Sequence, residues 1–199
     1  FSVVFPDGVI DDIILNMGGL HNVENAVVSI AIARNLGIDQ VKIKDAVEAF
    51  RGVKRRFEYV LKNKRLVFVD DYAHHPEELK VLITGARSLF PGRKCTVIFQ
   101  PHLFSRTRDL AEAFSASLDL ADEVILLPIY PARELPIEGV SSEIISRNIS
   151  SEKVKLLNKE QLLNHLASNY LHDDINRLII TAGAGDIDTL VKPIKELFN

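Results

Sequence analysis

The sequence has one cysteine, no tryptophan and no apolar run long enough to span a membrane. Cys95 is the only cysteine among 199 residues, so no disulfide can form within the chain, and a reducing, cytoplasmic location is expected. Apolar runs stay below the roughly 18 residues of a transmembrane helix. No charged-then-apolar signal peptide is found either. These absences indicate neither a membrane span nor export, so no membrane partner is expected.

A general excess of positive charge is also missing. Lys and Arg number 24 and Asp and Glu 27, so the formal net charge is -3 and there is no basic field for coating nucleic acid. The segment 51–65 is an exception, with one acid, Glu58, and seven basic residues: Arg51, Lys54, Arg55, Arg56, Lys62, Lys64 and Arg65. Such a cluster either binds a phosphate or carboxylate or is a solvated face. Nucleic-acid binding through it is the least favoured function.

Hydrophobic patterning divides the chain into two parts. Helical spacing predicts helices at 20–36 and 40–50 with no strand between them, and 1–6 is expected to be a strand or linker entered from an upstream segment. Strands are then expected at 57–61, 66–71, 95–99, 123–127, 154–157 and 178–182, alternating with helices at 76–89, 107–118, 141–148, 159–170 and 187–198. This alternation predicts an α/β class with a doubly wound, mostly parallel sheet of about six strands.

Polar side chains follow the strands of this sheet, where ligands bind in such folds. The strand at 66–71 runs into Asp70-Asp71-Tyr72-Ala73-His74-His75-Pro76. Carboxylates, a phenol and imidazoles can hold a ribose hydroxyl, orient an amine or carry protons near neutral pH. Alternatively, Asp70 or Asp71 only caps the next helix. Metal binding is less favoured, because adjacent histidines without further ligands at helical spacing are a weak metal signal.

Two further strand ends are polar. The strand at 95–99 is followed by Gln100-Pro101-His102 and then Ser105-Arg106-Thr107-Arg108. If Ser105 or Thr107 caps the next helix, the basic side chains lie over its N-terminus, which favours anions; the alternative is a satisfied histidine with solvated arginines. The glycines in 183–185 favour a tight turn first and a ligand contact second. No Walker A, G-x-S-x-G or H-E-x-x-H sequence occurs.

Four motifs, in order, resemble the Mur ligases of bacterial peptidoglycan synthesis: Gly19-Leu20-His21-Asn22-Val23-Glu24-Asn25-Ala26, Phe50-Arg51-Gly52-Val53-Lys54-Arg55-Arg56, Asp70 to Pro76, and Gln100-Pro101-His102 through Arg106-Thr107. Within the family they are most similar to the branch that joins L-alanine to UDP-N-acetylmuramate. The murein tripeptide recycling ligase is the nearest alternative. One departure is Leu103, where the family often has an arginine that contacts the UDP-sugar or phosphate.

The resemblance implies a fragment of a three-domain enzyme. Residues 1–56 would be the end of the central ATP-binding domain and 57–199 the Rossmann-like C-terminal domain, while the phosphate-binding loop and most magnesium ligands would lie upstream. ATP would phosphorylate the lactyl carboxylate of UDP-N-acetylmuramate, and the amine of L-alanine would attack the acyl phosphate. The fragment alone is expected to be inactive.

The resemblance also implies roles for individual residues, among which we assign no metal ligand and no general base. His21, Asn22 and Asn25 would surround adenine, Arg56 would reach the ATP phosphates, and Asp71 would hold the ribose. The alanine and acyl-phosphate site would be lined by Tyr72, His74, His102 and Arg106, with Arg106 pairing the alanine carboxylate and His74, His102 and Arg106 taking part in catalysis. A different hypothesis is a stand-alone module that binds a small carboxylate or nucleotide.

Overall fold

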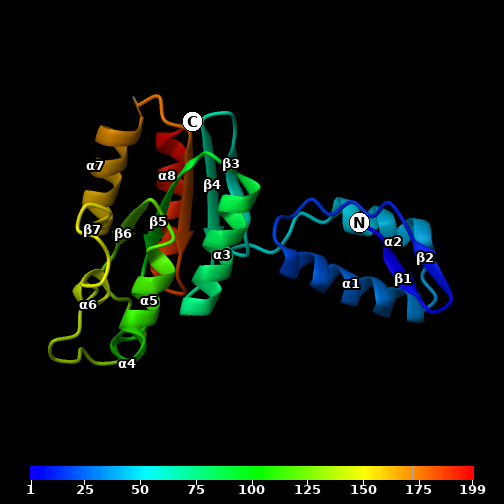
Figure 1. Ribbon diagram of the computed structural model, residues 1–199, viewed down its shortest axis with the longest axis horizontal. Coiled ribbons are helices and arrows are strands. Elements are labelled where there is room, and N and C mark those ends of the chain that lie inside the picture. The colour runs from blue at the N-terminus through cyan, green and yellow to red at the C-terminus, as the bar shows by residue number, and fades with distance from the viewer. Residues whose placement is uncertain (172) are drawn as a thin grey trace. The chain divides into compact units, whose positions relative to one another are not determined.

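The computed structural model describes residues 1–171 and 173–199, with His21 described by its backbone only. The chain divides into two compact units, Phe1–Val53 and Lys54–Asn199 (Figure 1). The sequence analysis placed residues 54–56 with the first unit. In the structure they belong to the second, where the Tyr72 amide donates to the Arg55 carbonyl over 2.7 Å.

The first unit is a hairpin with two helices. Strands β1 (Val3–Phe5) and β2 (Gly8–Ile10) pair antiparallel, and α1 (Leu20–Asn35) and α2 (Gln40–Ala49) follow. Both predicted helices are confirmed, while the second strand of the hairpin was not predicted. Asp39 caps α2 by accepting from the Val41 amide over 2.9 Å. A small core holds the unit together: Val3, Ile10, Ile13, Ile30 and Ile43.

The second unit is built on a six-stranded sheet, which confirms the predicted class. Its order is β3-β4-β8-β5-β6-β7. The strands are β3 (Glu58–Lys62), β4 (Leu66–Asp71), β5 (Lys94–Phe99), β6 (Glu123–Leu126), β7 (Val154–Leu156) and β8 (Arg177–Ala182). Only β3 runs antiparallel to its neighbour, β4; the other pairings are parallel.

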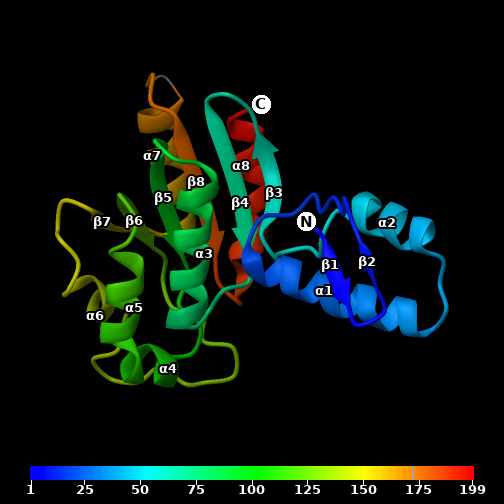
Figure 2. The same cartoon turned by 45° about the vertical axis from the view of Figure 1, so that its right-hand side comes forward.

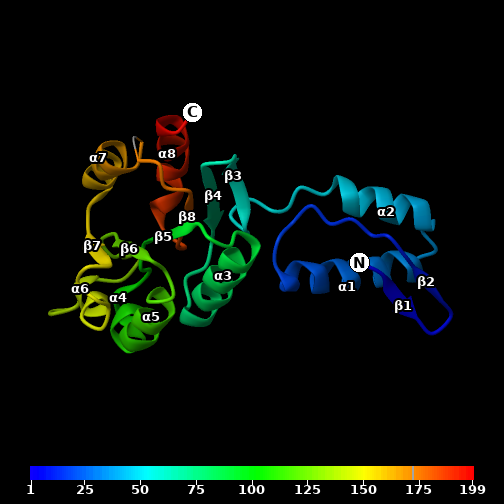
Figure 3. The same ribbon diagram turned by 45° about the horizontal axis from the view of Figure 1, so that its top comes forward.

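Helices cover both faces of this sheet, as alternating side chains along its strands require. Val67 and Val69 of β4 pack into one core with α3 (Pro76–Leu89), α5 (Ala111–Leu118) and α6 (Glu143–Ser146). Phe68 points into the opposite core with α7 (Lys159–Tyr170), the 3-10 helix η1 (Asp186–Leu190) and α8 (Val191–Leu197). In Figure 3, α3 and α5 lie on one side of the strands and α7 and α8 on the other. None of the helices in the described parts of the chain could cross a membrane.

Two predicted helices are each divided in the structure. The helix expected at 107–118 is two helices, α4 (Phe104–Asp109) and α5, because Leu110 between them has φ -118° and ψ 15°. The helix expected at 187–198 begins with the 3-10 turn η1 before α8. Hydrophobic spacing did not reveal either break, because the apolar positions continue across both.

A polar pair is buried between the neighbouring strands β4 and β8. Thr181 Oγ1 donates to Asp70 Oδ1 over 2.6 Å, and Asp70 is only 1% exposed. Arg55 Nε lies 3.6 Å from the other carboxylate oxygen. Burial is the largest influence on this carboxyl and raises the pKa of Asp70 to about 6. The folded chain therefore holds the Asp70 proton more tightly than the unfolded chain does.

The Asp70→Asn variant lacks this titrating carboxyl. Comparing it with the wild-type chain therefore isolates the contribution of Asp70 to the pH dependence of the unfolding free energy. Because folding raises the pKa of Asp70, ionisation of this carboxyl destabilises the folded chain. The destabilisation is complete above about pH 6 and absent at pH values well below the ordinary pKa of 3.8. Between pH 7 and pH 5 the wild-type chain should gain roughly 1 kcal/mol in unfolding free energy relative to the variant. Urea unfolding of both proteins at both pH values measures this difference; a constant difference, or one of opposite sign, would contradict it.

Candidate functional site

Four strand ends meet at the carboxyl edge of the sheet. Since β4, β8, β5 and β6 are parallel, the segments that follow them emerge at the same edge, toward the side on which α4 lies (Figure 2). The ends of β4 and β5, which carry the two polar motifs, are not adjacent in the sheet. In the structure β8 lies between them. Side chains from the two ends nevertheless meet, since the ring centroids of His74 and His102 lie 6.3 Å apart.

A row of aromatic rings joins these loops. Tyr72 and His74, after β4, have ring centroids 5.3 Å apart. His74 lies 6.3 Å from His102, which follows β5. His102 in turn stacks on Tyr130, after β6, at 5.7 Å with an angle of 20° between the rings. The structure thus brings together Tyr72, His74 and His102, three of the residues proposed from the sequence, with Tyr130.

Buried polar atoms without hydrogen-bond partners concentrate beside these rings. Among the described residues they include Gln100 Oε1, His102 Nδ1 and Arg106 Nη1. Buried polar groups are normally paired, so such atoms mark positions where a ligand can complete the hydrogen bonding. A guanidinium suits an anionic group and an imidazole nitrogen suits a proton donor or acceptor. The arrangement fits a small molecule that carries a carboxylate and an amine.

The protonation state of His102 follows from its surroundings. Burial, then the charge of Arg106 and the proximity of His74, lowers the pKa of His102 below its ordinary value of 6.5, although Glu134 acts in the opposite direction. Near neutral pH the imidazole is therefore uncharged and keeps one nitrogen as an acceptor. This state is compatible with binding a group that must give up a proton.

The two aspartates at the end of β4 shape the loop and do not cap the helix. The Asp71 carboxylate accepts from the amides of Phe57 and Ala73, each over 2.7 Å, while Asp70 pairs with Thr181. The amides at the start of α3 are instead satisfied by Glu78, whose carboxylate accepts from His75 over 3.0 Å. The interpretation of Asp70 or Asp71 as a helix cap is therefore wrong.

The expected caps of the next helix are also wrong. Leu103, with φ 73°, is the residue that precedes α4. Thr107 Oγ1 donates to the Leu103 carbonyl over 2.7 Å, and the Ser105 hydroxyl donates to Glu134. Arg106 and Arg108 lie in the last turn of α4, not over its N-terminus, and Arg108 is exposed and paired with Asp109 over 2.7 Å. Distant Glu134 supplies the cap that local residues were expected to provide.

Arg55 contacts this edge, and the sequence analysis had singled out Arg56. Arg55 donates to the carbonyl of Gly183, and its guanidinium lies 4.9 Å from the centre of the Tyr72 ring. Arg56 is exposed. Both arginines are in the 50–56 motif quoted above. The motif alone does not indicate which of two adjacent arginines contacts the sheet edge, because this depends on the course of the folded backbone.

The residues proposed for adenine lie in the other unit, at the start of α1. Asn22 Nδ2 donates to the Gly18 carbonyl over 2.6 Å, and Asn25 is exposed. The side chain of His21 lies outside the described part of the chain. Arg56 and Asp71, proposed for the phosphates and ribose, belong to the second unit.

Close packing explains the glycines after β8. A Cβ at Gly185 would lie 2.5 Å from Gln100 Oε1 and 2.6 Å from Tyr130 Cβ, and one at Gly183 would lie 2.7 Å from the Gln100 carbonyl. Beside them is a cavity of about 520 Å³ whose lining includes Gln100, Tyr130, Lys159 and Asp186. Asp186 accepts from Gln100 Nε2 over 2.8 Å and pairs with Lys159 over 2.8 Å. The glycines therefore serve the turn that lets these groups approach.

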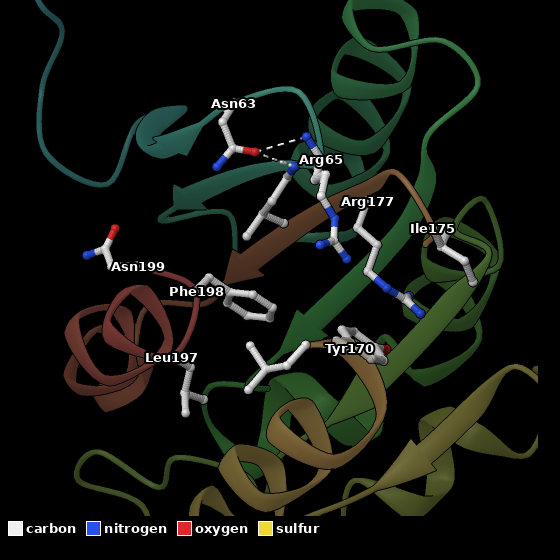
Figure 4. A pocket seen from close by; sticks show the side chains of 10 residues that line it. Asn63, Arg65, Tyr170, Ile175, Arg177, Leu197, Phe198 and Asn199 are labelled. Atoms are coloured by element: carbon white, nitrogen blue, oxygen red, sulfur yellow. Dashed lines mark hydrogen bonds between the residues drawn. The ribbon is translucent and has the colours of Figure 1, made fainter. Parts of the chain in front are cut away.

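A second cavity, of about 240 Å³, lies at the amino edge of the sheet (Figure 4). Its most buried charged residue, Arg177, is already paired with Glu123 over 3.1 Å and with Asp173, and it stacks on the Tyr170 ring at 3.6 Å. Paired charges of this kind hold a structure together. We therefore place the candidate site at the carboxyl edge, where polar atoms remain unpartnered.

Within the described ranges, no group of three or more His, Cys, Asp or Glu side chains is placed to hold a metal ion. The implied magnesium therefore has no matching donor set among these residues. Cys95 is also no candidate nucleophile, because burial raises the pKa of its thiol to about 12.

Comparison with known proteins relates this chain to a family of ligases. The family described as Mur ligase, glutamate ligase domain, matches residues 55–185. The UDP-N-acetylmuramate--L-alanine ligase of Cytophaga hutchinsonii is 50% identical over 187 residues, which cover 94% of this chain and 39% of that protein. The corresponding Flavobacterium johnsoniae ligase is 42% identical over 199 residues, covering 100% of this chain and 43% of that protein.

Comparison with solved structures identifies ligases as well. The UDP-N-acetylmuramate-alanine ligase of Thermotoga maritima has a TM-score of 0.72 and 31% identity, covering 92% of this chain and 38% of that one. A murein peptide ligase from Psychrobacter arcticus, at 24% identity with a TM-score of 0.62, shares the fold. The chain spans about two fifths of the length of the curated relatives named above. With the family match extending over residues 55–185, this chain belongs to the Mur ligase family.

Proposed function

We propose that this chain is part of a cytoplasmic, ATP-dependent ligase of peptidoglycan synthesis that joins L-alanine to UDP-N-acetylmuramate. The observation that carries the proposal is the unpartnered pair His102 Nδ1 and Arg106 Nη1 beside His74. These groups suit the amine and carboxylate of a small amino acid. The 50% identity to a ligase of that name supports the choice of L-alanine.

The proposed reaction has two steps. ATP transfers its terminal phosphoryl group to the lactyl carboxylate, which makes an acyl phosphate and ADP. The alanine nitrogen then attacks the carbonyl carbon, the C–O bond to phosphate breaks with its electron pair, and the nitrogen loses a proton. Phosphorylation turns a poor leaving oxygen into a good one, so the protein mainly has to position the reactants and balance charge.

The residues at the carboxyl edge position the amino acid. Arg106 would pair with the alanine carboxylate, and uncharged His102 would accept a hydrogen bond from the amine, with His74 and Tyr72 closing the other side. We assign no general base. Arg106 also offsets the negative charge that develops as the amine attacks.

The proposed contacts to ATP involve five residues. Asn22 and Asn25, with His21, would contact adenine, since a carboxamide offers both a donor and an acceptor. Arg56 would contact the phosphates and Asp71 the ribose. Magnesium would accompany ATP, but we assign none of its ligands to this chain, because the described residues hold no suitable donor set.

We expect the 199-residue chain alone to release no phosphate from ATP in the presence of magnesium, UDP-N-acetylmuramate and L-alanine. The reason is chemical, because its sequence contains no Walker A loop to grip the phosphates. The measurement is a coupled phosphate assay beside the full-length protein that carries this chain. Turnover by the chain alone would contradict the proposal, and tight calorimetric binding of L-alanine by the chain alone would favour the stand-alone binding module.

In the full-length protein, His102→Ala and Arg106→Ala should each lower kcat/KM for L-alanine by about a hundredfold. Each change removes a group proposed to contact the amino acid, so the melting temperature should change little. Arg147→Ala, which removes an exposed arginine following α6, is the matched control and should leave kcat/KM unchanged. If activity and melting temperature fall together, the two residues are structural and the site assignment fails.

A further inference from the structure

The short helix α4 has no N-cap side chain from the residues next to it in the sequence. The first N–H groups of any helix have no partner within it, and a Ser, Thr, Asp or Asn side chain usually supplies one. Here the preceding residue is Leu103, in the left-handed region with φ 73°, and no local side chain caps the helix. Arg106 nevertheless lies within α4, and His102 lies two residues before the first residue of this helix. The geometry of both therefore depends on what holds this helix start.

Glu134 holds it from the loop between β6 and α6. Its Oε2 accepts from the Ser105 amide over 2.9 Å, and its Oε1 accepts from the Ser105 hydroxyl. These hydrogen bonds lower the pKa of the Glu134 carboxyl, which therefore stays ionised at neutral pH. A carboxylate at this position satisfies an amide and complements the positive end of the helix.

The same loop also contacts the segment around His102, through backbone hydrogen bonds and a stacked ring of Tyr130. The Leu103 amide donates to the Tyr130 carbonyl over 3.0 Å, and the Tyr130 amide donates to the Pro101 carbonyl over 2.8 Å. The Tyr130 ring stacks on the His102 ring. Residues 130–134 thus bracket the segment from His102 to Arg106, with backbone bonds and a ring at one end and a carboxylate at the other.

We propose that Glu134 is a positioning residue for the amino-acid site: through Ser105 it fixes the first turn of α4, and thereby aims His102 and Arg106 at the bound amino acid. It does not touch the substrate. The proposal rests on the proposed function, because it takes its ligand, a small amino acid, from there. Its structural part, the fixed helix start, can be tested without any activity.

The structural test uses hydrogen exchange of the 199-residue chain. Glu134→Ala should speed amide exchange of Ser105 about tenfold or more, because the amide loses a charged acceptor. Glu138→Ala, an exposed glutamate in the same loop, is the matched control and should leave this exchange unchanged. Equal exchange of Ser105 in the Glu134→Ala and Glu138→Ala chains would overturn the proposal.

The functional test uses steady-state kinetics of the full-length protein. Glu134→Ala should raise KM for L-alanine about tenfold or more while KM for ATP stays unchanged, and Glu134→Gln, which keeps one acceptor oxygen, should recover part of the loss. If Glu134→Ala fails to fold, Ser105→Ala removes the hydroxyl bond alone and should raise KM for L-alanine in the same direction. A general loss affecting both substrates equally would assign Glu134 to stability and overturn the proposal.

The two proposals fail in different ways. A wild-type protein without L-alanine-dependent ADP formation overturns the proposed function, whatever the exchange of Ser105 shows. A wild-type protein that has this activity, with Glu134→Ala matching the Glu138→Ala control in KM for L-alanine, overturns only the positioning role.

Discussion

The parallel pairing of β8 between β4 and β5 is the constraint on which the second unit depends. Every residue of β8, from Arg177 to Ala182, is buried, and each face of the strand needs a helical layer over it. The chain meets this need by placing α3, α5 and α6 over one face and α7, η1 and α8 over the other. Because the central strands then run in one direction, their carboxyl ends all open at one edge, and the loops that leave them form the candidate site.

The two edges of the sheet use charge differently. At the amino edge Arg177 is paired with Glu123 and Asp173 and covered by Tyr170, so its cost of burial is offset by hydrogen bonds and ion pairs. At the carboxyl edge His102 and Arg106 keep buried nitrogen atoms without partners. An unpaired buried polar group lowers stability, so its presence where four loops converge favours a binding role.

Local patterns predicted most of the elements. Strand β4 and helices α3 and α7 were predicted at their observed bounds, since a continuous apolar run or helical spacing ends there at a turn or a cap. The sequence did not predict that β8 inserts between β4 and β5, because its pairing with β4 joins residues far apart in the chain, such as Asp70 and Thr181, which are separated by 111 positions. Nor did it separate Arg55 from Arg56.

The start of α4 shows why site geometry is harder to predict than secondary structure. Ser105 and Thr107 have the right chemistry to cap a helix, so a local rule chose them, but the cap comes from Glu134, which lies 29 residues further along. That carboxylate reaches α4 only when β6 has paired with β5 and the following loop has folded back. The orientation of His102 and Arg106 is therefore a product of the assembled sheet, and any substitution that loosens the β5–β6 pairing should disturb the site before it unfolds the unit.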